Sequence, residues 1–66
     1  MKVTFNEHDD ALYVRLDQTP IVESEEVRPG VILDYDGNDQ VVGVELLGAG
    51  GRVDRAEVRS MHFEVA

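Results

Sequence analysis

The sequence predicts a mainly β protein: a small antiparallel sheet of β-hairpins, followed by a short helix, a final strand or both (an α+β variant) at the C-terminus. Several short runs alternate apolar and polar residues, which is the period of a strand. Gly, Asn, Asp and Pro cluster between these runs, as in turns. At 66 residues the chain, residues 1–66, is expected to be a single small domain. We expect five or six strands.

Residues 2–6 and 11–16 predict a first hairpin around the polar turn 7–10. One register places every large aliphatic side chain on one face, and a slip of one residue would invert all of them. Its pairs are Val3 with Val14 and Phe5 with Leu12. Tyr13 then lies on the other face, opposite Thr4.

Residues 21–27 predict a polar strand with three glutamates at its centre. Pro29-Gly30 ends it, because proline cannot donate to a strand ladder.

A second hairpin is predicted around a Gly37-Asn38 turn, since both residues tolerate positive φ. The expected pairs are Tyr35 with Gln40, Leu33 with Val42 and Val31 with Val44, with Ile32 opposite Gly43 on the other face. This register sets Asp36 against Asp39, and like charges in that position are destabilising. The repulsion between the two carboxylates indicates either a longer loop or a bound cation.

Residues 48–51 include three glycines, which predict a flexible joint. Beyond them, Asp54 can cap a short helix within residues 52–60. Met61, Phe63 and Val65 alternate with polar residues and predict a final strand.

The net charge is −8, and residues 1–47 carry eleven acidic but only three basic residues. Direct binding of nucleic acid is therefore disfavoured, since phosphate contacts need Lys and Arg. A basic protein partner is favoured by electrostatic steering. The candidate interaction residues are Glu23, Glu25, Glu26, Tyr13 and Arg15.

A domain this small buries only about 60% of the surface of its unfolded chain, so we expect a homodimer or a larger homo-oligomer. There is no Cys, no apolar segment typical of a signal peptide follows Met1, and no run is long enough to span a membrane. These features predict a cytoplasmic protein without membrane contact.

Asp34, Asp36, Asn38 and Glu45 match positions 1, 3, 5 and 12 of a calcium-binding EF-hand loop. Position 6 is Asp39 where the loop needs Gly, and the flanks are β-branched rather than helical. We therefore predict no metal site. Weak cation binding in the 34–45 loop, at Asp36 and Asp39, stays an alternative.

No catalytic constellation stands out, and no cofactor is predicted. His8 and His62 lie in a polar turn and on a polar strand face, and Ser24 has no neighbouring His or Lys to activate it. The favoured function is a non-catalytic protein-interaction module. The alternative is a ligand-binding or enzymatic subunit that uses Tyr13, Arg15, Asp34 and Glu45.

Three segments in order, residues 10–16, 23–36 and 42–47, resemble the bacterial domain of unknown function 2283 family. The resemblance covers residues 3–49. After Leu47 the usual Asp-Ala-Ser-like continuation is replaced by Gly48-Ala49-Gly50-Gly51. The resemblance implies a small stand-alone protein encoded beside another small protein, as in toxin–antitoxin pairs. An acidic chain would then neutralise a small basic partner.

Overall fold

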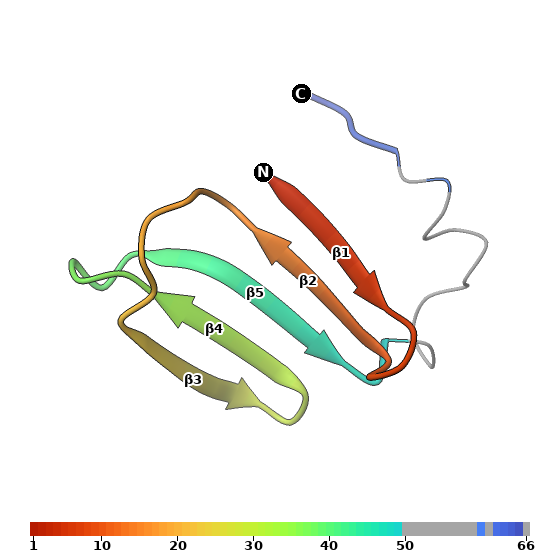
Figure 1. The fold of residues 1–66 in the computed structure, drawn as a ribbon, viewed down its shortest axis with the longest axis horizontal. Helices are drawn as coiled ribbons and strands as arrows, with labels where there is room; N and C mark the ends of the chain where they lie inside the picture. The colour runs from red at the N-terminus through yellow and green to blue at the C-terminus, as the bar shows by residue number, and fades with distance from the viewer. Residues whose placement is uncertain (50–59, 61, 66) are drawn as a thin grey trace.

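The computed structural model describes residues 1–49, 60 and 62–65 and contains one antiparallel sheet (Figure 1). Its strands are β1 (Lys2–Asn6), β2 (Ala11–Arg15), β3 (Glu23–Arg28), β4 (Val31–Tyr35) and β5 (Val41–Leu47). They are arranged in the order β1-β2-β5-β4-β3. The mainly β prediction is confirmed.

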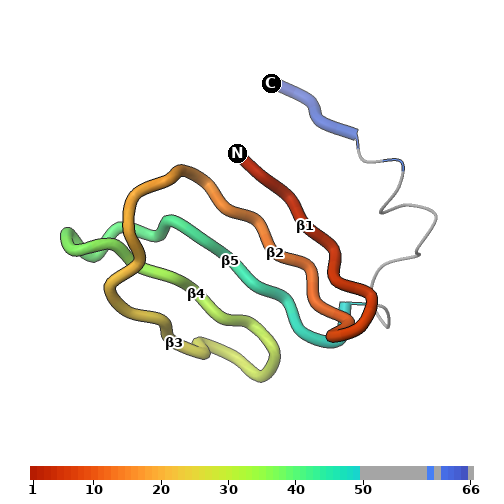
Figure 2. Tube along the Cα trace, viewed as in Figure 1, coloured from red at the N-terminus to blue at the C-terminus, as the bar shows by residue number. Residues whose placement is uncertain are grey.

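The connection from β2 to β3 passes the ends of β5 and β4, the two strands that separate them in the sheet (Figure 2). The backbone N–H of Leu16 donates to the carbonyl of Val42, and that of Val22 donates to the carbonyl of Tyr35. The connection is thereby tied to each strand that it passes. Strands β2 to β5 form a four-stranded Greek key in which β5 returns beside β2.

The first hairpin has the predicted register. Val3 pairs with Val14, Phe5 with Leu12 and Thr4 with Tyr13. In the turn, Asp10 takes a left-handed conformation with φ of 52°, which Asp tolerates better than most residues.

The predicted register of the second hairpin is wrong by two residues. Val31 pairs with Leu46 and Leu33 with Val44, where we expected Val44 and Val42. The loop is longer than the two-residue turn, because the side chain of Asp36 organises it: its Oδ1 accepts from the N–H of Asn38 and of Gln40, at 2.8 and 2.9 Å. The shift of two residues keeps Val31, Leu33 and Val44 on their predicted face, since the period of a strand is two. At Tyr35 the shift is one residue, because an irregularity follows Asp34 and Tyr35 pairs with Val41 where we expected Gln40.

Asp36 and Asp39 do not form the predicted opposed pair. Asp36 lies within the loop, and the N–H of Asp39 donates to the Asp36 carbonyl at 3.1 Å. Asp39 is left-handed with φ of 60°. The expectation of a longer loop is therefore confirmed.

The polar strand is shorter than predicted, because β3 begins at Glu23 rather than Ile21. Ile21 and Val22 stay in the connection with 41% and 69% of their surface exposed. The predicted turn at Pro29-Gly30 is present, with Gly30 at φ of 79°, and an irregularity between Glu26 and Arg28 precedes it.

The predicted final strand is absent from residues 62–65, which have no strand structure and leave Phe63 73% exposed. An alternating pattern is not enough without a neighbouring strand that takes up its hydrogen bonds. The predicted helix in residues 52–60 lies outside the described residues except for Ser60, which is in a turn. No helix in the described part of the chain has the length and hydropathy of a membrane span.

Strand pairing divides the sheet into an apolar and a polar face. The apolar face carries eight side chains from four strands: Val3, Phe5, Leu12, Val14, Val31, Leu33, Val44 and Leu46. All eight are only half-buried, and Val42, at 1% exposure, is the one large side chain among the described residues that is almost fully enclosed. The described strands thus form a single layer.

The Asp36 loop gives a first prediction. Asp36→Ala leaves the N–H groups of Asn38 and Gln40 without their acceptor, so we expect a loss of roughly 1–2 kcal/mol in the free energy of unfolding. Asp36→Asn retains an acceptor oxygen and should lose much less. Urea denaturation compares the two, with Asp39→Asn as the control. Equal midpoints for Asp36→Ala and wild type would contradict this role.

Candidate functional site

The polar face brings together Tyr13, Arg15, Asp34 and Glu45, the four residues of the predicted ligand-binding alternative. Glu45 lies opposite Tyr13 in the pairing of β2 with β5. In the next row, Gly43 lies between Arg15 on β2 and Asp34 on β4. The side chains therefore come from three adjacent strands and share one face.

Asp34 is the centre of a hydrogen-bonded network. The Tyr13 hydroxyl donates to Oδ2 of Asp34 at 2.7 Å. The hydroxyl of Ser24, on β3, donates to Oδ1 at 2.6 Å. Asp34 is only 8% exposed, and a buried carboxylate is costly unless its oxygens are paired. Both oxygens have a donor, so the burial is compensated.

Gly43 provides the space for this network. A Cβ atom at this position would lie 2.5 Å from the Tyr13 hydroxyl oxygen and 2.8 Å from Oδ2 of Asp34. Both distances are far below van der Waals contact. The hydrogen bond between Tyr13 and Asp34 therefore crosses β5 directly above the glycine, and any other residue would have to displace it.

The network raises the pKa of the Tyr13 hydroxyl above its usual value of 10.0. The main cause is the hydrogen bond to Asp34, which requires the proton, and burial acts in the same direction. Arg15 partly opposes both effects. The phenol is therefore a hydrogen-bond donor and not a base at neutral pH.

Arg15 donates hydrogen bonds to the backbone of the connection between β2 and β3. Its Nε donates to the carbonyl of Asp17 at 2.6 Å, and its Nη2 donates to the carbonyl of Thr19. The N–H of Thr19 donates to the Asp17 carboxylate and lowers the pKa of that exposed group. The guanidinium thus holds the start of the connection.

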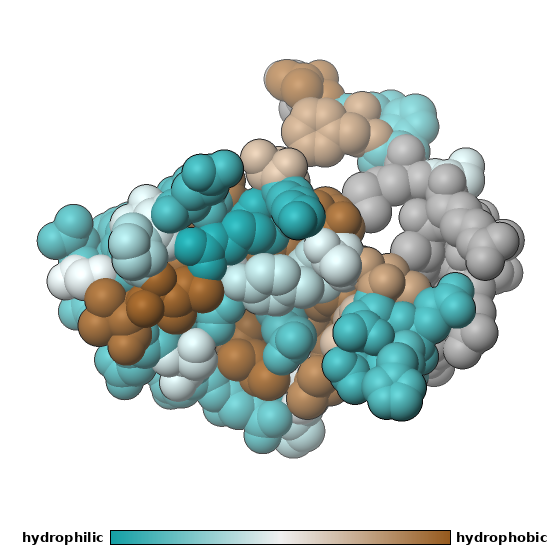
Figure 3. Space-filling model, in the orientation of Figure 1, coloured by the Kyte–Doolittle hydropathy of each residue, from teal (hydrophilic) through white to brown (hydrophobic). Residues whose placement is uncertain are grey.

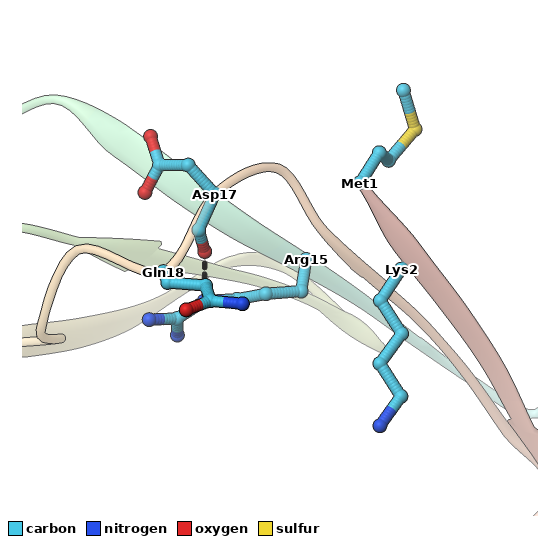
Figure 4. A pocket seen from close by; sticks show the side chains of 5 residues that line it. All are labelled: Met1, Lys2, Arg15, Asp17 and Gln18. Carbon is cyan, nitrogen blue, oxygen red and sulfur yellow. Dashed lines mark hydrogen bonds between the residues drawn. The ribbon is translucent and has the colours of Figure 1, made fainter.

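A cavity of about 170 Å³ lies beside this bend, between the start of β1 and the end of β2 (Figure 4). Its lining residues are Met1, Lys2, Arg15, Asp17 and Gln18. Lys2 and Arg15 are cross-strand partners, so two cations adjoin it. Two N–H groups of Arg15 already have backbone acceptors, and the cavity is separate from the Asp34 network.

The arrangement around Asp34 is suited to holding strands together rather than to acid–base chemistry. A general base must be within reach of the proton that it removes, whereas Asp34 is 8% exposed and each of its oxygens already accepts a hydrogen bond from the protein. The hydroxyl of Ser24 is committed as a donor to a carboxylate. These contacts link β2, β4 and β3 across β5.

The predicted acidic surface is placed on strand β3, at one edge of the described sheet. Glu23, Glu25 and Glu26 are all exposed. Glu26 shares the polar face with Tyr13, while Glu23 and Glu25 belong to the opposite face, so the five candidate residues do not form one patch. Figure 3 shows hydrophilic residues over most of the visible surface, with smaller hydrophobic patches between them.

The remaining candidates are dispersed. His8 is exposed in the first turn, and His62 lies 3.5 Å from the carboxylate of Glu64. Asp36 uses Oδ1 to organise its loop, while Glu45 lies in mid-strand opposite Ile32. No group of three or more His, Asp or Glu side chains among the described residues could hold a metal ion.

Sequence reasoning missed Ser24 and Gly43 as parts of the network. The residue pattern presents Ser24 only as a candidate nucleophile, and the predicted register sets Gly43 opposite Ile32. A signal for Gly43 was present, because a lone glycine within Val41-Val42-Gly43-Val44 is typical of a close approach in a strand. Nothing in the sequence pairs Ser24 with Asp34.

The Tyr13 hydroxyl gives a second prediction. Tyr13→Phe removes one donor from buried Asp34, so we expect a loss of roughly 1–3 kcal/mol in the free energy of unfolding at pH 7. The raised pKa means that folding favours the protonated phenol. This contribution is complete below pH 10.0 and is lost as pH rises through the folded pKa.

Urea denaturation between pH 7 and 11 tests both parts. The advantage of wild type over Tyr13→Phe should shrink above pH 10.0. Tyr35→Phe is the matched control, since it also removes one phenol. An advantage that stayed constant up to pH 11 would contradict the proposed coupling.

A third prediction concerns Gly43. Gly43→Ala should destabilise the protein by roughly 1–3 kcal/mol, because the added methyl group displaces Tyr13 and Asp34. In a Tyr13→Phe background the hydroxyl is absent, so the same substitution should cost less. A double-mutant cycle measures this coupling. Purely additive effects would show that Gly43 is not required for the hydrogen bond.

Comparison with protein-family models gives a match over the whole described sheet. A family model described as protein of unknown function (DUF2283) matches residues 2–49, which include all five strands. No curated protein and no solved structure matches the chain significantly. The expected family is therefore confirmed, and the chain belongs to the DUF2283 family.

Proposed function

We propose that this chain is a non-catalytic interaction module that binds a small basic protein through strand β3. The observation that carries the proposal is the acidic edge, which we define as Glu23, Glu25 and Glu26. All three side chains are exposed, and none has a hydrogen bond or ion pair with another described residue. They are available to cations of a partner.

The charge of the whole chain supports the same kind of partner. The net charge is −8, so a basic protein is attracted from a distance and its approach is accelerated. Arg28, at the end of β3, donates to the carbonyl of Val27 and is not engaged with the glutamates. The acidic edge therefore keeps its negative potential.

The backbone of β3 supports a defined mode of binding. The N–H of Val22 donates to Tyr35 on β4. The N–H of Leu47 on β5 donates to Gly30, so by alternation the backbone groups of Leu33 and Tyr35 point toward β3 and meet Glu25 and Glu23. The backbone groups of Ser24 and Glu26 therefore point away from the sheet. An extended segment of the partner can add beside β3 as a further strand, and its Lys or Arg side chains can pair with the acidic edge. The bound partner would be neutralised as in a toxin–antitoxin pair.

A ligand-binding or enzymatic role for Tyr13, Arg15, Asp34 and Glu45 has less support. The four residues share a face, but the Tyr13 hydroxyl, both carboxylate oxygens of Asp34 and two N–H groups of Arg15 are engaged within the protein. The neighbouring cavity is lined by only one of the four, Arg15.

The fourth prediction tests the acidic edge. A triple variant, Glu23→Gln, Glu25→Gln and Glu26→Gln, should lose a basic protein that wild type captures from a lysate of the native host. The matched control carries the same charge change elsewhere: Asp9→Asn, Asp39→Asn and Glu64→Gln. It should retain the partner. Capture by wild type should also weaken with added salt, because exposed charges are screened.

Three results would count against the proposal. These are the absence of any captured protein, the capture of an acidic one, and equal losses in both triple variants. Circular dichroism of each variant first establishes that the sheet is intact.

A further inference from the structure

The described sheet has two edges, β1 and β3, and they differ in chemistry. The edge at β3 is acidic, whereas β1 has the sequence Lys-Val-Thr-Phe-Asn and contains no carboxylate, glycine or proline. Its pairing with β2 is regular over all five residues. Its one charge, Lys2, is at its first residue, and a regular edge with an uncharged centre is ready to pair with another strand. We propose that β1 pairs with β1 of a second copy of this chain.

The backbone of β1 presents the groups that such pairing needs. The N–H of Leu16 donates to Val42 on β5, so the backbone groups of Leu16 point away from β1. By alternation, those of Tyr13 point toward β1 and meet its partner Thr4. The N–H and C=O groups of Val3 and Phe5 therefore point outward. No described strand lies beyond β1 to pair with them.

Symmetry restricts the register. Two identical strands in one sheet pair antiparallel around a two-fold axis, and paired residues must lie on the same face. An axis at Thr4 meets this condition and uses all five residues of β1. It sets Val3 opposite Phe5 of the second copy on the apolar face, and Lys2 opposite Asn6 on the polar face. An axis at Val3 or at Phe5 would leave part of the strand unpaired.

The acidic edge is unsuited to the same pairing. An axis at Glu25 would oppose two carboxylates directly, and like charges in this position are destabilising. An irregularity also interrupts β3 after Glu26. Pairing through β1 leaves β3 at both outer edges of the joined sheet. The assembly is thus compatible with the proposed function but does not depend on it.

A cysteine at the axis tests the inference directly. The chain has no Cys, so a disulfide in Thr4→Cys can form only between copies. Thr4 is exposed, and the backbone directions make its pair with the second copy non-hydrogen-bonded, with Cα atoms about 4.5 Å apart. This spacing suits a disulfide. Mild oxidation should convert the 7.4 kDa chain to a species of twice that mass. Glu25→Cys, at the centre of β3, is the control and should form no disulfide-linked species.

Charged substitutions at Thr4 give a second, independent test, in which light scattering measures the mass of the particle. Thr4→Glu and Thr4→Lys should each be monomeric, because each opposes two like charges at the axis. An equimolar mixture should regain the dimer mass, while wild type is dimeric throughout. Circular dichroism verifies that each variant is folded.

Each contrary result overturns the inference. A wild-type monomer at millimolar concentration would do so, and so would equal cross-linking of Thr4→Cys and Glu25→Cys. A dimer that persists in both Thr4→Glu and Thr4→Lys would assign the contact to another surface, such as the apolar face. If one charged variant fails to fold, the comparison of Thr4→Cys with Glu25→Cys still tests the inference.

Discussion

The fold depends on one buried carboxylate. Asp34 lies on the polar face of β4, accepts from Tyr13 on β2 and from Ser24 on β3, and reaches Tyr13 over Gly43 on β5. Four adjacent strands thereby meet at one ionisable group. Breaking such a network at one partner leaves a buried polar group unsatisfied, which costs more than the intact network contributes. The network therefore restricts how these strands can pair.

The Asp34 carboxylate also accounts for the register of the second hairpin. The expected register would set Gly43 opposite Ile32 and leave Asp34 beside Val41, with no space for Tyr13 to reach it. In the observed register Asp34 lies opposite Gly43, and the loop from Asp36 to Gln40 lengthens to accommodate the shift. Apolar contacts alone do not distinguish the two registers, because both place Val31, Leu33 and Val44 on one face. The polar contacts decide between them.

The polar face, the acidic edge and strand β1 are suited to different roles. The polar face is closed by its own hydrogen bonds, so it holds strands together and leaves few free groups for a substrate. The acidic edge keeps its glutamates without partners among the described residues and is suited to a basic protein. Strand β1 is neutral apart from Lys2 and has outward backbone groups, which suit a second copy of the same strand. The two proposed contacts thus use different edges of the sheet and do not compete.

The sequence by itself determined the β class, the register of the first hairpin, the turn at Pro29-Gly30 and the faces of the apolar side chains. All of these follow from local turn chemistry and from the period of two along each strand. Only the tertiary structure decided the order of the strands, the register of the second hairpin and the meeting of Tyr13, Ser24 and Asp34. These depend on contacts between residues 10 and 21 positions apart, which no local pattern encodes. The alternation in residues 62–65 was a misleading signal for the same reason, since a strand needs a neighbour as well as a pattern.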